Sequence, residues 1–324
     1  MAVTVGTVTA ESGEKKTGTF TTAETRDGAP IEHPVHVING EGEGPTLWVQ
    51  GCIHGNEYVG AVAVLEAWQE LDPGDVDGAL VLVPALNVTA FRHGSRGSPH
   101  EYKYQLDLNR VFPGERHGKF TQFVAREVFE AFVDAADYLL DFHTGSHPDT
   151  RWALYSDVGD VGEAAAELGR ALGFPYLLAT QEAGEALPLE GSMFVQGALR
   201  GIPGVIVESG AKGTVDEAAL RDAKRAIYNV AGALDLVDAP REPVAETTVE
   251  LSDWAVLAAS RGGRLRCEAT PGDAFEEGDV LGRVEDFDGT TVEEFTAPFD
   301  GHVLMSSEAP FVASGDGVFQ LGRE

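Results

Sequence analysis

The sequence predicts an α/β fold with a mixed, mostly parallel sheet and helices on both faces, followed by a small all-β domain. From residue 46 to residue 237, short apolar runs typical of strands alternate with segments of helical periodicity. Beyond residue 246 the helical pattern disappears and Gly-punctuated β sequence continues to the end. A length of 324 residues, at roughly 150 residues per domain, also suggests two domains.

Residues 1–45 are predicted to form an N-terminal β segment packed on the α/β domain that follows. Val, Thr and Phe alternate with polar residues there, and turn signals occur at Asp27-Gly28 and Asn39-Gly40. We expect short antiparallel strands, one of them near residues 35–38.

Residues 46–238 are predicted to form the α/β domain. Its strand 79–86 is apolar throughout, which is typical of a strand covered on both faces. The polar stretch 87–118, rich in Arg and Gly, is too long for an ordinary connection and indicates a functional loop region. The other expected strands are 47–51, 138–142, 176–180 and 204–207, and the expected helices are 59–71, 120–135, 161–172, 192–200 and 216–237.

A Pro-rich linker, residues 238–246, leads to the β-rich domain 247–324. Residues 263–265 (Gly-Arg-Leu) precede a Gly-Asp pair by 15 positions, and residues 301–303 (Gly-His-Val) precede another by 14. This weak duplication predicts a pseudo-symmetric barrel or sandwich, similar in layout to biotinyl/lipoyl domains. No Lys follows Lys224, so the domain is expected to be unmodified and to have a structural or substrate-gating role.

The charge of the chain excludes several classes of partner. Asp and Glu number 53 against 23 Lys and Arg, giving a net charge of −30. Such a surface repels nucleic acids and anionic membranes. Only six of the basic residues are Lys, and this acid surplus with little Lys predicts a halophilic protein whose self-repulsion is screened by salt. A hydrophobic content of 43% excludes a disordered acidic chain.

The remaining composition predicts a soluble, cytoplasmic protein. Cys52 and Cys267 are far apart and match no metal-binding or redox spacing. The N-terminus lacks the basic and apolar regions of a signal peptide, and no apolar run reaches the ~18 residues of a membrane span. A homo-oligomer is compatible with the sequence.

Four polar side chains follow three predicted strands at the points where these strands end. His54 and Glu57 follow the first strand, His143 follows strand 138–142, and Glu208 follows strand 204–207. In an open α/β sheet the ligand site lies at the carboxyl ends of the strands, so these residues are expected to converge.

Two imidazoles and one carboxylate are a donor set that suits zinc and leaves a fourth position for water. Zinc lowers the pKa of such a water towards ~7 and polarises a carbonyl. Glu208, as a carboxylate outside the ligand set, would accept the proton and return it to the leaving nitrogen. Other interpretations stay open on spacing alone, because the HxxE pattern is common and a single His such as His143 is often structural. His147 makes an HxxxH spacing with His143, but its Pro- and Gly-containing loop favours a pocket wall.

Four motifs occur together in a fixed order, and they resemble those of the succinylglutamate desuccinylase/aspartoacylase family, relatives of the zinc carboxypeptidases. The resemblance covers about residues 30–324. The motifs are HGNE at residues 54–57, DLNR with FPG at 107–114, DFHTG at 141–145, and Val207-Glu208.

The resemblance implies that His54, Glu57 and His143 bind one Zn²⁺ per chain. It also implies that Glu208 is the general base and acid.

Asn109 and Arg110 would hold the carboxylate of the substrate, the Arg as a planar two-donor fork. The family also uses an Arg about eight residues before this pair to polarise the scissile carbonyl, and Tyr102 departs from that pattern. Arg96, or alternatively Arg92, is expected to supply the charge instead.

We therefore expect a zinc-dependent deacylase that cleaves the linear amide of an N-acyl amino acid or a related small carboxylate. Its positive pocket would attract a small anionic substrate. A metallocarboxypeptidase or an esterase could use the same site, and the departure at Tyr102 would also fit a catalytically silent protein that binds zinc and ligand.

Overall fold

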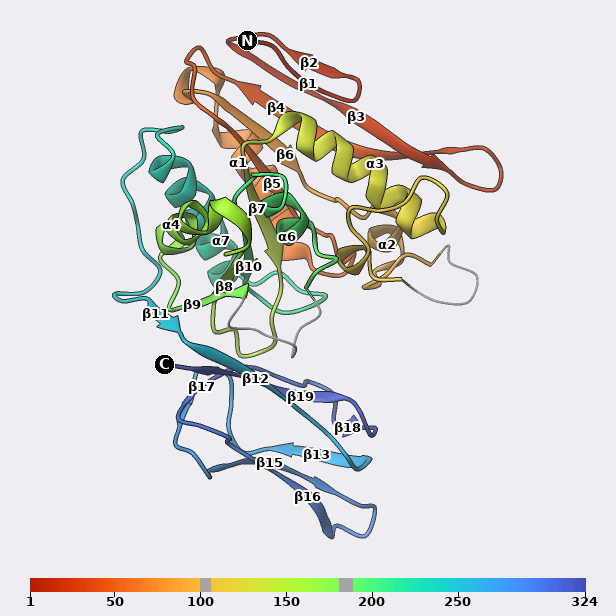
Figure 1. The fold of residues 1–324 in the computed structure, drawn as a ribbon, viewed down its shortest axis with the longest axis vertical. Coiled ribbons are helices and arrows are strands. Elements are labelled where there is room, and N and C mark those ends of the chain that lie inside the picture. Colours follow the sequence, from red (N-terminus) through yellow and green to blue (C-terminus); the bar gives the residue numbers. More distant parts are fainter. Residues whose placement is uncertain (100–105, 181–188) are drawn as a thin grey trace.

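The computed structural model describes residues 1–99, 106–180 and 189–324, which form an α/β part and a smaller β part beneath it (Figure 1). The α/β part is built on a nine-stranded sheet of order β11-β9-β8-β10-β7-β5-β6-β4-β3. Five of its eight neighbouring strand pairs are parallel, which confirms a mixed, mostly parallel sheet. The strands are β3 (Glu14–Glu24), β4 (Pro30–Asn39), β5 (Thr46–Gln50), β6 (Ala79–Val83), β7 (Tyr138–His143), β8 (Trp152–Tyr155), β9 (Tyr176–Ala179), β10 (Gly204–Glu208) and β11 (Val249–Leu251), and a separate hairpin consists of β1 (Val3–Val5) and β2 (Val8–Ala10).

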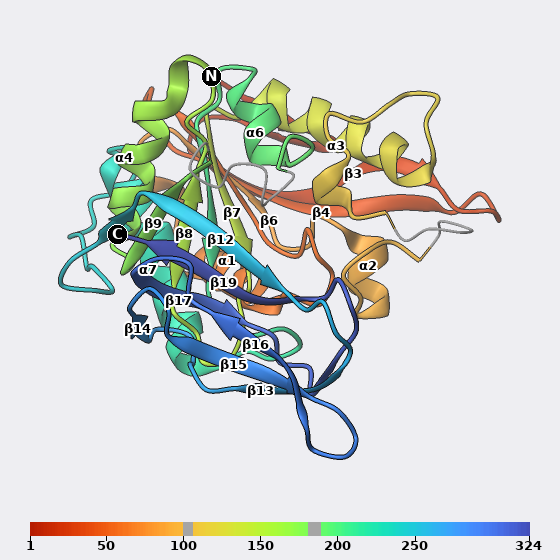
Figure 2. The ribbon, with the colours of Figure 1, turned by 60° about the horizontal axis from the view of Figure 1, so that its bottom comes forward.

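Helices cover both faces of the nine-stranded sheet (Figure 2). One face packs against α1 (Tyr58–Glu70), α4 (Gly162–Leu172) and α7 (Glu217–Ala233). The other packs against α3 (Phe120–Ala135) and α6 (Met193–Ala198). Successive strand residues point to opposite faces. In β10, Val205 and Val207 accordingly contact the first layer and Ile206 the second, so a strand buried on both faces needs the continuous apolar run that its sequence shows.

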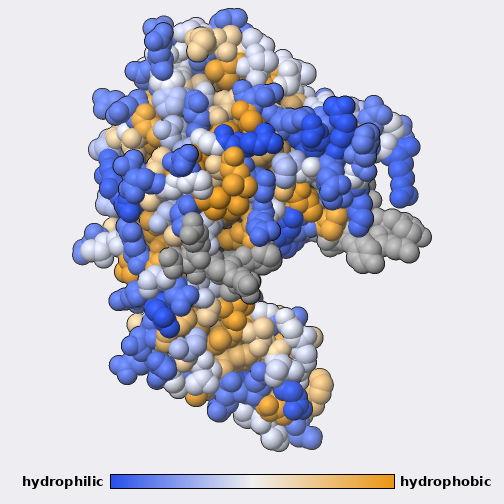
Figure 3. All heavy atoms as spheres, viewed as in Figure 1, coloured by the Kyte–Doolittle hydropathy of each residue, from blue (hydrophilic) through white to orange (hydrophobic). Residues whose placement is uncertain are grey.

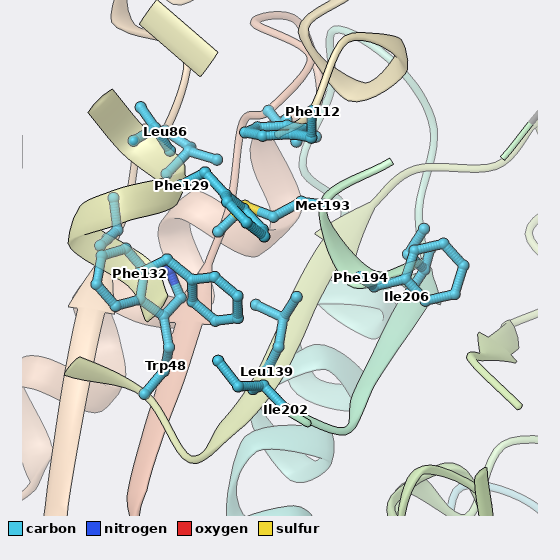
Figure 4. Packing of buried hydrophobic residues seen from close by; sticks show 14 of the residues in the cluster. Trp48, Leu86, Phe112, Phe129, Phe132, Leu139, Met193, Phe194, Ile202 and Ile206 are labelled. Atoms are coloured by element: carbon cyan, nitrogen blue, oxygen red, sulfur yellow. The ribbon is translucent and has the colours of Figure 1, made fainter. Parts of the chain in front are cut away.

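Aromatic side chains fill the core on the α3 and α6 side. Trp48 of β5 meets Phe132 of α3 edge to face, with the ring centroids 5.7 Å apart. The ring centroids of Phe129 and Phe132 are 6.0 Å apart, and Met193 at the start of α6 packs into the same cluster (Figure 4). This packing holds the sheet and α3 together behind the edge of the sheet where the site lies.

Two elements of the α/β part were not predicted. Residues 87–118 contain the short helix α2 (Val88–His93), capped by the Asn87 side chain, which accepts from the Ala90 amide. Strand β8 lies antiparallel to β10. It follows β7 without an intervening helix, so it breaks the strand-helix alternation on which the prediction depended. Strand β6 ends at Val83 rather than Leu86 because Pro84 has no N–H to continue the ladder.

The C-terminal part consists of two four-stranded antiparallel sheets, of orders β12-β19-β17-β14 and β16-β15-β13-β18. The two sheets share one hydrophobic core, in which Phe295 and Phe319 meet with ring centroids 5.7 Å apart. Neither sheet closes on itself, so the predicted barrel is not confirmed. The strands are β12 (Asp253–Ala258), β13 (Gly263–Cys267), β14 (Ala274–Phe275), β15 (Val280–Glu285), β16 (Thr291–Thr296), β17 (Gly301–Ser306), β18 (Phe311–Val312) and β19 (Gly317–Arg323).

Gly278 and Gly315, the glycines of the two predicted Gly-Asp turns, adopt φ of +94° and +95°, a conformation that favours glycine.

The predicted domain limits at residues 45 and 247 stay predictions. Strands β3 and β4 belong to the same sheet as the strands that follow them. Among the described residues, no helix has the length and apolar character needed to cross a membrane.

Candidate active site

Four of the predicted site residues lie where three neighbouring parallel strands, β5, β7 and β10, end. His143 and Glu208 are the last residues of β7 and β10 and pair with each other in register. The next strand, β5, ends at Gln50, and the chain turns back from it into α1. Because all three strands run in the same direction, their carboxyl ends meet at one edge of the sheet.

A tight turn between β5 and α1 brings His54 and Glu57 to this edge. Cys52, which is fully buried, adopts φ of +52°. A Cβ on Gly55 would lie 2.0 Å from the carbonyl carbon of Ala90, so only glycine fits there. Glu57 is the N-cap of α1 but its carboxylate makes no capping bond. The carboxylate is therefore free to face the two histidines.

His54, Glu57 and His143 form a compact, buried cluster. His54 Nδ1 lies 3.0 Å from Glu57 Oε1, His143 Nδ1 lies 3.2 Å from Glu57 Oε2, and the two Nδ1 atoms are 3.1 Å apart. Each residue is at most 5% exposed. One possible ligand atom from each residue lies within 4.8 Å of the others, so the three side chains could hold a metal ion. Two imidazoles and a carboxylate are a donor set that suits zinc.

The far nitrogen of each histidine faces a second carboxylate. His54 Nε2 lies 3.1 Å from Asp107 Oδ1, and His143 Nε2 lies 3.3 Å from Asp141 Oδ2. Metal-binding histidines commonly donate their other N–H in this way, which fixes the ring orientation and strengthens the ligand. The sequence analysis missed these roles of Asp107 and Asp141, although both residues stand two positions before a predicted site residue.

The close packing of these side chains shifts the pKa values of Glu57 and His143. Burial acts to raise the pKa of Glu57, but His54 and His143 outweigh it and hold the pKa well below its usual range. Burial acts to lower the pKa of His143, while Asp141 and Glu57 raise it well above its usual range. Both pKa shifts have the same cause: the buried imidazole and carboxylate groups lie within hydrogen-bond distance of one another, and each stabilises the charged form of the other.

Glu208 lies beside this cluster without belonging to it. Burial raises the pKa of its carboxyl and Glu57 adds to this effect, whereas the positive charges of His143 and Lys212 act to lower the pKa. Its Oε2 atom is buried and has no hydrogen-bond partner among the described residues. A carboxylate with a free oxygen and a raised pKa can accept a proton from a reacting group.

Arg96 reaches the cluster from the loop after α2. Its Nη2 lies 2.8 Å from Asp107 Oδ2, and its Nη1 lies 3.2 Å from His54 Nδ1 and 3.5 Å from Glu57 Oε1. Arg92, the alternative, is exposed and does not line the cavity. Tyr102 lies outside the described residues.

Asn109 and Arg110 lie on a short 3-10 turn, Leu108–Arg110, at the mouth of the cluster. Asn109 Oδ1 accepts from the Met193 amide at 2.9 Å, which leaves Asn109 Nδ2 3.3 Å from His143 Nε2. A Cβ on Gly191 would lie 2.1 Å from the Arg110 carbonyl oxygen. The start of α6 thus holds both residues in place.

All seven predicted site residues line one cavity of about 350 Å³, a volume in the range of small-molecule sites. A larger cavity of about 460 Å³ lies between α1 and α7 and contains none of these residues. His147 lines neither and is exposed, its amide donating to Glu308. The cavity is lined by His54, Glu57, Arg96, Asn109, Arg110, His143, Thr144, Trp152, Leu154, Leu189, Ile206, Glu208, Lys212, Trp254, Met305 and Gln320.

Three of these lining residues come from the C-terminal part: Trp254, Met305 and Gln320. The two parts are held together near the cavity by the Trp152 and Trp254 rings, whose centroids are 5.0 Å apart. A hydrogen bond from Thr150 Oγ1 to the Leu304 carbonyl adds to this contact, at 2.8 Å. The C-terminal sheets therefore complete the wall of the site.

Comparison with known proteins identifies the family. The family model of the succinylglutamate desuccinylase/aspartoacylase catalytic domain matches residues 43–234. The chain belongs to this family. The predicted family and the predicted enzyme class, an amidohydrolase, are confirmed.

Relatives in this family include an N-alpha-acetyl-L-2,4-diaminobutyric acid deacetylase of Halomonas elongata. It is 31% identical over 288 residues, which cover 86% of this chain and 81% of the relative. The product-bound ectoine utilization protein EutE (DoeB) of Ruegeria pomeroyi is 25% identical, with a TM-score of 0.86 and 99% of both chains covered. A succinylglutamate desuccinylase/aspartoacylase of Rhodobacter sphaeroides shares the fold, with 24% identity, a TM-score of 0.84, and coverage of 97% and 96%.

Proposed function

We propose that this chain is a zinc-dependent deacylase that hydrolyses the amide of a small N-acyl amino acid. The observation that carries the proposal is the buried triangle of His54 Nδ1, His143 Nδ1 and the Glu57 carboxylate, with a free carboxylate oxygen of Glu208 in the same cavity. A zinc ion held there would polarise the scissile carbonyl and make a water molecule acidic enough to attack it.

The side chains of the cavity would carry the other roles. Glu208 Oε2 accepts the proton of the attacking water and returns it to the leaving nitrogen. Arg110, placed beside Asn109, binds the carboxylate of the substrate. Arg96 stabilises the negative charge that develops on the carbonyl oxygen.

The limited size of the cavity favours a small acyl-amino acid over a peptide. Its volume of about 350 Å³ is bounded on one side by residues of β12, β17 and β19, which leaves little room for a chain of several residues. The 31% identical deacetylase is named for an acetylated amino acid, which supports the same class of substrate.

The variant Glu208→Gln tests the proposal. It keeps the size of the side chain and removes the proton acceptor, so kcat should fall by about 100-fold or more, while the zinc content measured by mass spectrometry stays at one per chain. Glu167→Gln, which makes the same change at an exposed carboxylate on α4, serves as the matched control and should retain full activity. An unchanged kcat in the Glu208 variant would reject its assignment.

The same assay distinguishes the alternatives. N-acyl amino acids, short peptides with a free C-terminus, and esters would be compared side by side with the zinc-loaded protein. Faster cleavage of peptides would indicate a carboxypeptidase, and faster cleavage of esters an esterase. Zinc binding without turnover of any substrate would indicate a silent binding protein.

A further inference from the structure

The connection between β7 and β8 passes over the end of β10. In the sheet, β10 lies between these two strands, parallel to β7 and antiparallel to β8. Residues 144–151, which join β7 to β8, therefore cross the carboxyl end of β10. Glu208 is the last residue of β10 and pairs with His143 on one side and with Trp152 on the other. The connection thus lies next to the proposed general base.

The side chain of Asp149, in this connection, binds the chain that follows Glu208. Beyond the end of β10, the Ser209 amide donates to the His143 carbonyl oxygen at 3.2 Å. The next amide, that of Gly210, donates to Asp149 Oδ2 at 2.6 Å. A side chain of the connection therefore continues the hydrogen bonding where the strand ladder stops.

Arg151 holds Asp149 in place. Asp149 Oδ1 accepts from the Arg151 amide at 3.0 Å, and Arg151 Nη1 donates to the Asp149 carbonyl oxygen at 3.2 Å. Arg151 Nε in turn lies 2.9 Å from Asp222 Oδ2 on α7. Arg151 adopts φ of +51°, which is uncommon for a residue other than glycine and persists where the surrounding contacts hold it. The connection is therefore fixed both to α7 and to the end of β10.

Asp149 has no direct part in the proposed reaction. Its side chain is 8% exposed and does not line the catalytic cavity, and each of its two oxygens accepts a backbone amide. The carboxyl of Glu208, by contrast, has a buried Oε2 atom without a hydrogen-bond partner among the described residues. The backbone on either side of Glu208 therefore contributes to the position of this carboxyl.

We propose that Asp149 is a positioning residue for the general base: by binding the Gly210 amide, it keeps the carboxylate of Glu208 where it can take the proton of the attacking water. This inference rests on the proposed deacylase function. Arg151 and Asp222 keep Asp149 in place and do not touch the substrate. Because a misplacement of about 1 Å at a reacting group can cost about 100-fold in rate, this contact acts on turnover from outside the cavity.

The variant Asp149→Asn tests the positioning. Its carboxamide has nearly the same shape but only one oxygen, so it cannot accept from both backbone amides in the same way. We expect kcat to fall by about 10- to 100-fold, KM to stay within about twofold, and bound zinc to be unchanged. Asp137→Asn is the matched control, because Asp137 Oδ2 accepts from the Thr46 amide at 2.8 Å at the amino end of β5, although Asp137 is more exposed. It should alter neither kcat nor KM.

Combination with Glu208→Gln distinguishes positioning from a general loss of stability. If Asp149 acts through Glu208, Asp149→Asn should lower kcat no further in a protein that already carries Glu208→Gln, because residues that act as a unit have non-additive effects. A wild-type kcat in Asp149→Asn would overturn the proposal. So would a loss of kcat by the same factor with and without Glu208→Gln.

Hydrogen exchange separates failure of this proposal from failure of the deacylase function. In Asp149→Ala, which removes both acceptors, the peptide 204–216 should exchange at least about threefold faster than in the wild type, as measured by mass spectrometry. Asp137→Ala should leave its exchange unchanged. Equal exchange in the wild type and Asp149→Ala would reject the proposal even in a protein that hydrolyses no acyl-amino acid. Faster exchange in a protein without hydrolysis would reject the deacylase function, and the positioning role with it.

Discussion

At the scale of single residues, the site depends on which atom of each side chain faces the cluster. Both histidines present Nδ1 to Glu57, and their Nε2 atoms face Asp107 and Asp141. Asp141 is fully buried, and its Oδ1 atom has no partner among the described residues. A buried charge of this kind is stable only beside a cation or a strong donor, which the His143 ring provides.

Replacing Asp141 by Asn should therefore weaken zinc binding without removing a ligand. The change keeps the shape but removes the charge that orients His143, so the Kd for zinc should rise by about 10- to 100-fold, as measured by competition with a chromophoric chelator. Asp222→Asn is a matched control, because Asp222 is also buried but pairs with Arg151. It should lower the free energy of unfolding and leave the zinc Kd unchanged. An unaltered Kd in the Asp141 variant would contradict the orienting role.

At the scale of elements, the distance between α1 and β7 sets the geometry of the cluster. His54 and Glu57 are attached to the start of α1, whereas His143 ends β7. The helix crosses the strand at Gly60, where a Cβ would lie 2.2 Å from Phe142 Cβ. Glycine at this position lets the helix lie close enough to the strand for His54 and Glu57 to meet His143.

The variant Gly60→Ala should separate helix and strand. Alanine is the better helix former by about 1 kcal/mol, yet here it overpacks a dense core, which typically costs about 1–3 kcal/mol. We expect a lower free energy of unfolding in urea and weaker zinc binding. Gly74→Ala, where a Cβ would meet nothing within 4 Å, should leave both quantities unchanged. A Gly60→Ala protein with wild-type stability and zinc affinity would show that the close approach is not needed.

At the scale of the whole molecule, the surface and the site have opposite electrostatic requirements. The chain carries a net charge of −30, and hydrophilic residues cover much of the face shown in Figure 3. The cavity, by contrast, is lined by three cationic side chains, those of Arg96, Arg110 and Lys212. Self-repulsion of the surface destabilises the compact state, while the positive groups inside the cavity attract an anionic substrate.

Salt should therefore stabilise the protein, as proposed for a halophilic chain. Because the Debye length shrinks from about 10 Å at ~0.1 M to about 3 Å at ~1 M, screening should raise Tm by roughly 5–10 °C between these concentrations of KCl. Differential scanning calorimetry measures the shift. Sucrose at equal osmolality is the control and should have a smaller effect. A Tm that is constant or falls with KCl would contradict the salt adaptation.

The sequence determined the layered α/β fold, the β-rich C-terminal part and the positions of His54, Glu57, His143 and Glu208 after strand ends, because the periodicity that marks helices and strands is a local property. It did not reveal β8, which follows β7 without an intervening helix and so breaks the strand-helix alternation, or α2, whose six residues lie in a polar stretch. The tertiary structure alone decided that Asp107 and Asp141 support the histidines and that β12, β17 and β19 wall the cavity. These are contacts between residues far apart in sequence, and they exist only once the sheet and the C-terminal sheets have packed together.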